Sequence, residues 1–142
     1  MKRLCSFILA SLALSWLPAS LSLCAAPVGE AEATAAAKGF LSRSGVAARV
    51  LPGRSVAGVE QRASLWIAAL EPSGHVVLAG STKCAPVISF SAEDFAEPPP
   101  GSPLDAKLRA DSDWCEEKVA DASAADDPQW AALAAAAAAA DT

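Results

Sequence analysis

The chain has 142 residues with a formal net charge of −5, and 53% of the residues are hydrophobic but only 6% aromatic. A chain of this length has room for one modest domain, and its core is small because alanine supplies much of the apolar fraction. The chain has no basic stripe for nucleic acid, and an anionic membrane surface would repel it. We therefore expect proteins or peptides as partners, and no nucleic acid.

Residues 1–26 have the three-part order of a secretory signal peptide. Lys2 and Arg3 precede an apolar stretch over residues 4–17, and small residues mark an exit near Ala26. The alternative is an N-terminal membrane anchor, but serines and Pro18 interrupt a stretch already short for a bilayer. We predict a secreted or periplasmic protein with no stable membrane span after processing. Removing this segment, which has two basic and no acidic residues, changes the net charge from −5 to −7.

Two cysteines remain after such processing, Cys84 and Cys115. In an exported protein they can form one disulfide. The alternative is a pair of small buried hydrophobic residues, and the sequence leaves both open. Because zinc sites use clustered ligands and His75 is the single histidine of the chain, we expect neither a metal nor a cofactor.

The mature chain begins with an alanine-rich amphipathic helix over residues 30–41. Its apolar face ends in Phe40 and Leu41, which we expect to dock on a sheet. Residues 46–51 are predicted as a short extended piece, and residues 52–55 as a turn. Residues 56–62 are a candidate fourth strand.

The central stretch, residues 64–95, predicts a hairpin followed by another strand. Leu65 and Ile67 point to one face and Trp66 to the other, so we expect both faces to be covered at least in part. Residues 72–74, Pro-Ser-Gly, provide the reversal, and residues 87–91 form a half-buried strand. The predicted core consists of Phe40, Leu65, Trp66, Ile67, Val77, Ile88 and Phe90.

A helix is predicted to begin after Ser102. Ser102 is a candidate N-cap, Pro103 suits the first helical position, and Asp105 lies three residues past the cap. The polar run 111–113 predicts a break in this helix. Alanine favours helix but buries little, so we interpret residues 121–142 as a tail, linker or weakly held helix. The fold class is α+β, a small antiparallel sheet of three to four strands packed against N-terminal and C-terminal helices.

The residue types and their spacing indicate no set of catalytic residues. His75 and Cys84 flank a predicted strand and would lie near its opposite ends, away from the geometry of a nucleophile and its base. The paired acidic residues are adjacent in sequence and coat a solvated surface. The chain has no phosphate-binding loop, nucleophile elbow or metal motif. We therefore predict that this protein is not an enzyme.

Several segments nevertheless follow one another in a specific order. After the strand at 65–70 come SGHVVLAG at 73–80, KCAP at 83–86, VISFS at 87–91 and Phe95; the helix ending in Phe40-Leu41 precedes them, and Pro128-Gln129-Trp130 follows. This order resembles the propeptides of streptopain-like cysteine peptidases and the related standalone Spi-type inhibitors. The resemblance covers most of residues 30–130 and assigns residues 27–120 to an inhibitor domain.

The resemblance implies steric inhibition of a streptopain-like cysteine peptidase. The chain ends at Thr142 without a papain-like catalytic domain, which implies a detached inhibitor or propeptide. The loop at 95–103 would reach the active site and displace its histidine. The inserted polar residue corresponds to Ser102 or Gly101, and the predicted inhibitory loop consists of Pro100, Gly101, Ser102 and Pro103. The alternative is a secreted or envelope binding module that retains the fold without a protease partner.

Overall fold

Residues 27–43 and 45–142 are described by a computed structural model of the chain. The predicted signal peptide lies outside these residues. Within them, no helix combines the length and the apolar character needed to cross a bilayer. The elements in chain order are α1 (Glu30–Ser42), α2 (Val46–Val50), β1 (Ser55–Arg62), β2 (Leu65–Glu71), β3 (His75–Ala79), β4 (Val87–Ser91), α3 (Pro103–Ala120) and α4 (Gln129–Ala140).

The four strands form an antiparallel meander in the order β1-β2-β3-β4. Ile67 in β2 lies opposite Glu60 on one side and Val77 on the other. The turn between β2 and β3 needs Gly74, whose φ is +110°, a left-handed value that favours glycine. These strands and their flanking helices confirm the predicted α+β fold, with the candidate fourth strand present as β1.

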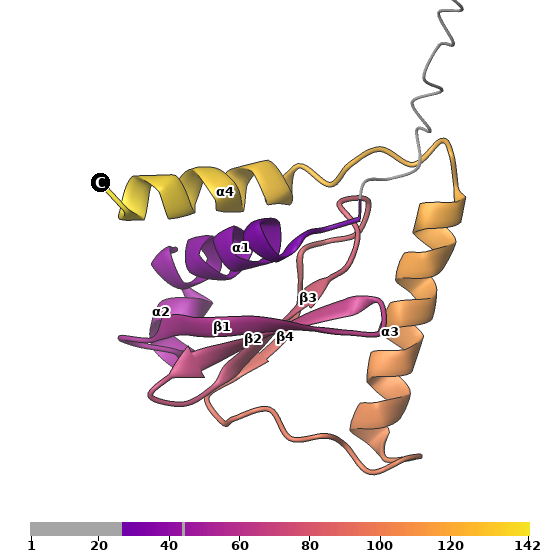
Figure 1. The fold of residues 1–142 in the computed structure, drawn as a ribbon, viewed down its shortest axis with the longest axis horizontal. Coiled ribbons are helices and arrows are strands. Elements are labelled where there is room, and N and C mark those ends of the chain that lie inside the picture. Colours follow the sequence, from indigo (N-terminus) through magenta and orange to yellow (C-terminus); the bar gives the residue numbers. More distant parts are fainter. Residues whose placement is uncertain (1–26, 44) are drawn as a thin grey trace, which may run out of the picture.

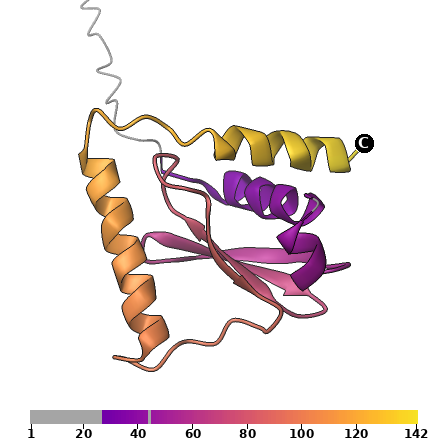
Figure 2. The same cartoon turned by 180° about the vertical axis from the view of Figure 1, so that it is seen from behind.

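Helices cover the two faces of the sheet unequally (Figures 1 and 2). One face packs under α1 and α4 in the larger apolar cluster, which includes Trp66, Leu78 and Leu133. The other face forms a small cluster in which Leu108 of α3 meets Leu65, Ile67 and Val77. This double burial explains why β2 is apolar on both sides.

The predicted core residues divide into a buried group and a marginal one. Leu65, Trp66, Ile67 and Val77 are buried, whereas Phe40, Ile88 and Phe90 are half-buried at the edge of the core. Phe40 of α1 contacts Phe90 of β4, with ring centroids 5.0 Å apart. The first helix therefore docks on the sheet through this aromatic pair.

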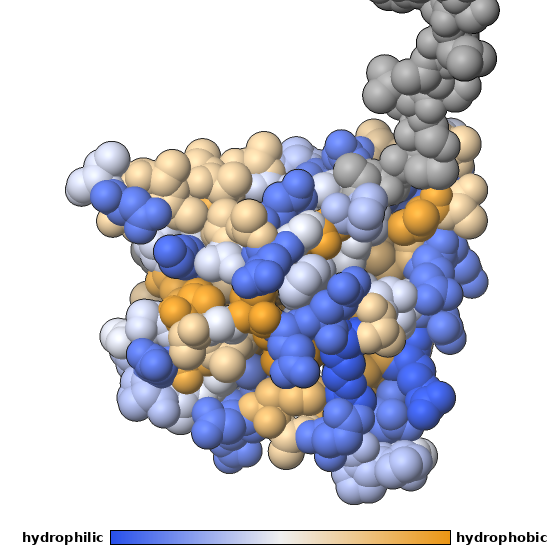
Figure 3. Space-filling view, viewed as in Figure 1, coloured by the Kyte–Doolittle hydropathy of each residue, from blue (hydrophilic) through white to orange (hydrophobic). Residues whose placement is uncertain are grey.

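Of the forms expected for the alanine-rich C-terminal segment, the structure has a helix over residues 129–140. This helix is α4, which runs beside α1 across the same face of the sheet in both views. Trp130, Leu133 and Ala137 are buried, and a Cβ added to Gly39 of α1 would lie 2.0 Å from the carbonyl oxygen of Leu133. The outward side of α4 shows the pale band of its alanines in Figure 3. Small residues on both helices thus permit an unusually close approach.

Two local predictions were wrong. Residues 46–51, expected to be extended, contain the short helix α2, which buries Ala47 and leaves Val46 and Val50 exposed. β-Branched valines favour strands only when a sheet surface receives them. In addition, α3 is continuous through residues 111–113. Its buried Leu108 and Cys115 lie on either side of this polar run, and these tertiary anchors override weak local propensity.

Candidate functional site

The segment that joins β4 to α3, residues 92–102, is the candidate site and is called the connecting loop below. Its first part is fixed to the β2–β3 turn by two hydrogen bonds. Ser73 Oγ donates to the carbonyl oxygen of Ala92 at 3.0 Å, and the Gly74 amide donates to Asp94 Oδ1 at 3.0 Å. The loop therefore leaves the sheet in a defined direction.

Phe95 fixes the next part of the loop. Its ring and the His75 ring are nearly perpendicular, with centroids 5.3 Å apart, and the Arg62 guanidinium lies 5.3 Å from the centroid of Phe95. Arg62 also forms an ion pair with Glu97. His75 Nδ1 donates to the carbonyl oxygen of Glu93 at 2.8 Å. His75 and Arg62 thus hold the loop against the sheet.

The apex of the connecting loop, Pro99–Gly101, is exposed, whereas Pro98 before it is buried. Gly101 has a φ of +80° and open space around the position of a Cβ, so the backbone conformation alone requires glycine. The Ser102 amide donates to the carbonyl oxygen of Pro99 at 3.0 Å and closes the apex as a turn. The apex is therefore an exposed turn with a defined backbone conformation.

The first turn of α3 fixes the second end. Ser102 Oγ accepts a hydrogen bond from the Asp105 amide at 3.2 Å, as expected for an N-cap. Asp105 Oδ2 accepts from the Gly101 amide at 2.9 Å and from Arg109 Nε at 3.0 Å. This reciprocal bond reaches one residue further back than a capping box does. The Gly101 amide lowers the pKa of Asp105, burial opposes it, and Arg109 adds to the lowering.

The four residues predicted for the inhibitory loop lie together at this apex. Pro100 and Gly101 are exposed at its tip, Ser102 is half-buried, and Pro103 is the first residue of α3. The residues that hold the loop were missed: Arg62 lies 35 positions from Glu97, and no local pattern joins them. Asp105 was noted as a capping residue, but its bond to Gly101 depends on the left-handed φ at that glycine.

A groove of about 620 Å³ lies beside the connecting loop, over the part of the sheet formed by β1 and β2. Its walls include Gly58, Glu60, Ala69, Phe95 and Glu97. The groove shares Phe95 and Glu97 with the loop. A partner that contacts the apex therefore has an adjoining concave surface on which to pack.

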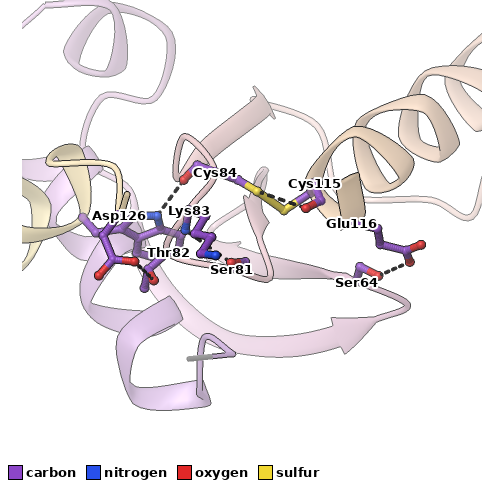
Figure 4. Close-up of a disulfide and its surroundings, with 9 residues drawn as sticks. Ser64, Ser81, Thr82, Lys83, Cys84, Cys115, Glu116 and Asp126 are labelled. Atoms are coloured by element: carbon purple, nitrogen blue, oxygen red, sulfur yellow. Dashed lines mark hydrogen bonds between the residues drawn. A yellow bond between two sulfur atoms is a disulfide. The ribbon is translucent and has the colours of Figure 1, made fainter. Parts of the chain in front are cut away.

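Cys84 and Cys115 form a disulfide between loop 80–86, which joins β3 to β4, and α3 (Figure 4). The Cα atoms of Cys84 and Cys115 are 5.8 Å apart, within the usual range. Trp130 Nε1 donates to the carbonyl oxygen of Cys84 at 2.8 Å, and the Asp127 amide donates to that of Thr82 at 2.7 Å. Loop 80–86 is therefore tied to α3 and α4 together.

In this disulfide-bonded form, Cys84 and Cys115 have a structural role. The sulfur of Cys84 is bonded to that of Cys115, so it is not a free nucleophile beside His75. Within residues 27–43 and 45–142, no three His, Cys, Asp or Glu side chains are grouped to hold a metal ion.

Comparisons with protein-family models, curated protein sequences and solved structures found no match. The function proposed for this chain therefore depends on the connecting loop, and on the order of sequence motifs around it.

Proposed function

We propose that this chain is an exported inhibitor, or a detached propeptide, that blocks the active site of a streptopain-like cysteine peptidase. The single observation that carries the proposal is an exposed apex, Pro99–Gly101, held at both ends by contacts to the sheet and to α3. The resemblance of residues 30–130 to peptidase propeptides supports the same loop. The alternative is a binding module that does not inhibit a peptidase, and the experiment below distinguishes it from an inhibitor.

Rigidity is what an inhibitory loop requires. A flexible loop loses conformational freedom when it enters a cleft, and that loss weakens binding. Here the prolines at 98–100 restrict φ, and the Ser102 amide already bonds to Pro99 before any partner is present. The apex would therefore enter a peptidase cleft at low entropic cost.

Ser102 can cap α3 and contact a peptidase at the same time. Its Oγ accepts from the Asp105 amide, and a hydroxyl has one further donor to offer. Among the described residues, that hydroxyl donates to no acceptor. In the proposed complex it would donate to a polar group in the active site, while the exposed Gly101 backbone lies nearest the displaced catalytic histidine.

The test uses a pair of matched glycines, Gly101 and Gly53. Both have positive φ values, +80° and +66°, and neither has a heavy atom within 4 Å of the position of a Cβ. A Gly→Trp change therefore introduces the same bulk and the same kind of backbone strain at each site. Inhibition of a purified streptopain-like peptidase is measured with a peptide substrate.

We expect Gly101→Trp to weaken inhibition at least about tenfold, equivalent to about 1.4 kcal/mol, and Gly53→Trp to leave it unchanged. Equal inhibition by both variants would remove the apex from the mechanism. If the unmodified chain neither inhibits such peptidases nor forms a complex with them, the inhibitor proposal is wrong and the binding-module hypothesis is favoured.

A further inference from the structure

We propose that the Cys84–Cys115 disulfide is a redox-sensitive clasp, which keeps the connecting loop in the geometry needed for inhibition and releases it on reduction. This inference rests on the proposed function for its consequence, the loss of inhibition. The conformational part of the inference can be tested without a peptidase.

Helix α3 has few buried anchors on the rest of the molecule. Its buried residues are Asp105, Leu108 and Cys115. Asp105 holds the connecting loop, so Leu108 and the disulfide are the two buried anchors that attach α3 to the sheet side. In contrast, Leu104 and Trp114 of α3 are exposed at 44% and 50%.

Two surface hydrogen bonds also join α3 and the residue that follows it to the sheet side of the molecule. Ser64 Oγ donates to Glu116 Oε1 at 2.8 Å, and Lys83 Nζ donates to the carbonyl oxygen of Asp121 at 2.8 Å. Both bonds are exposed to solvent, where such contacts stabilise little. Opening the disulfide would therefore remove the covalent attachment of α3 and leave it held by the packing of Leu108 and of the reduced Cys115.

The two ends of the disulfide differ in how firmly they are held. On one side, Cys84 lies in loop 80–86, which Trp130 of α4 and the amide of Val28 fix through the carbonyl oxygens of Cys84 and Gly80. On the other side, Cys115 belongs to α3, whose first turn fixes the apex of the connecting loop. When the clasp opens, α3 is the less firmly anchored part. A helix depends on tertiary packing for most of its stability, so the first turn of α3 frays and its Gly101–Asp105 bond opens more often.

Reduction needs a route to the sulfur atoms and an electron donor. A pocket of about 170 Å³ between α3 and β4 has both Cys84 and Cys115 in its wall, together with Ile88 and Trp114. The two cysteines are only 1% and 2% exposed, so a dithiol in this pocket reaches a sulfur atom when α3 fluctuates outward. The dithiol then attacks one sulfur as a thiolate and forms a mixed disulfide. Its second thiol then closes a cyclic disulfide. The protein gains two electrons and two protons as two cysteine thiols, and the dithiol is oxidised.

The proposed target indicates how reduction and oxidation would affect inhibition. A cysteine peptidase needs a reduced thiolate for its own chemistry. Reducing conditions would therefore activate the peptidase and open the clasp together, whereas oxidising conditions would favour both an inactive enzyme and a competent inhibitor.

The test compares the oxidised chain, the chain reduced with dithiothreitol, and the variant Cys84→Ala/Cys115→Ala. Hydrogen exchange is measured at the Gly101 and Ser102 amides, which bond to Asp105 and Pro99, and at the Ile67 and Val77 amides as a control for the sheet. In parallel, each form is assayed against peptidase that was activated beforehand and freed of reductant.

We expect reduction and the double variant to accelerate exchange at Gly101 and Ser102 by at least about tenfold with little change at Ile67 and Val77. Reoxidation should restore protection. Inhibition should fall in the same samples. Unchanged exchange at Gly101 would overturn the clasp, and so would equal loss of protection in the sheet, because the disulfide would then be a global staple. If no form inhibits, the proposed function fails while the exchange result still decides the clasp.

Discussion

The close approach of α1 and α4 predicts that replacing Gly39 with alanine destabilises the protein, although alanine is the better helix former. In an isolated helix, Gly→Ala at an interior position gains about 1 kcal/mol. Here the new Cβ would lie 2.0 Å from the carbonyl oxygen of Leu133 and 2.9 Å from its Cα. These are backbone atoms, so no side-chain rotation relieves the clash, and α4 must move away.

The size of the effect depends on how far α4 moves. Overpacking that the helices absorb by small shifts costs about 1–3 kcal/mol, which leaves a net loss of up to about 2 kcal/mol after the gain in helix propensity. If α4 leaves its site altogether, Trp130 and Leu133, now 8% and 2% exposed, enter water. Burial of two such side chains is worth about 3–6 kcal/mol.

The free energy of unfolding is measured by urea denaturation followed by tryptophan fluorescence, to which Trp66, Trp114 and Trp130 all contribute. Gly58→Ala in β1 is the matched control, because Gly58 has a φ outside the left-handed region and no heavy atom within 4 Å of a new Cβ. That variant should be neutral or stabilised by up to about 1 kcal/mol. A Gly39→Ala protein that gains stability would show that α4 does not pack on α1 in solution.

Three further predictions concern single side chains. Trp130→Phe should lose about 1–2 kcal/mol in urea denaturation, because it removes the donor to the buried carbonyl oxygen of Cys84. Leu108→Ala should lose about 2–4 kcal/mol, whereas Leu104→Ala, at a site 44% exposed, should change stability by less than about 1 kcal/mol; equal losses would contradict the packing of α3. Because the pKa of Asp105 is lowered in the folded protein, its stabilising effect should be complete above its ordinary pKa of about 3.9 and disappear as the pH falls through the lower folded value. Urea midpoints between about pH 6 and pH 2 should therefore converge with those of Asp105→Asn at the acid end.

The sheet could be predicted because its signals are local. The alternation of Leu65, Trp66 and Ile67 and the reversal at residues 72–74 lie within a few positions of one another. The start of α3 was equally accessible, since Ser102 and Pro103 are adjacent in sequence. Each of these features needs only a neighbour along the chain to take effect.

The docking of α4 could not be predicted by the same means. An alanine run has no apolar stripe that marks a buried face, and the partner of Leu133 is the backbone near Gly39, about a hundred positions away. The contacts that hold the connecting loop could not be predicted for the same reason, because they join residues that are far apart in the sequence. Arg62 and Glu97 belong to different elements, and an arginine at the end of a strand usually faces solvent.

Because the apolar core is small, the candidate site is held in place by hydrogen bonds, an ion pair and a disulfide. Most of the apolar residues on α1 and α4 are alanines, and α3 inserts Leu108 as its large buried side chain. A disulfide between residues 31 positions apart stabilises by about 3–4 kcal/mol in the loop-closure account, which is a large share of the 5–15 kcal/mol typical of a whole domain. That contribution acts directly on α3, whose other buried side chains are Asp105 and Leu108. Because α3 buries few side chains, its position depends on the disulfide at Cys115. In the proposed clasp, the connecting loop at the start of α3 therefore responds to whether Cys115 is oxidised or reduced.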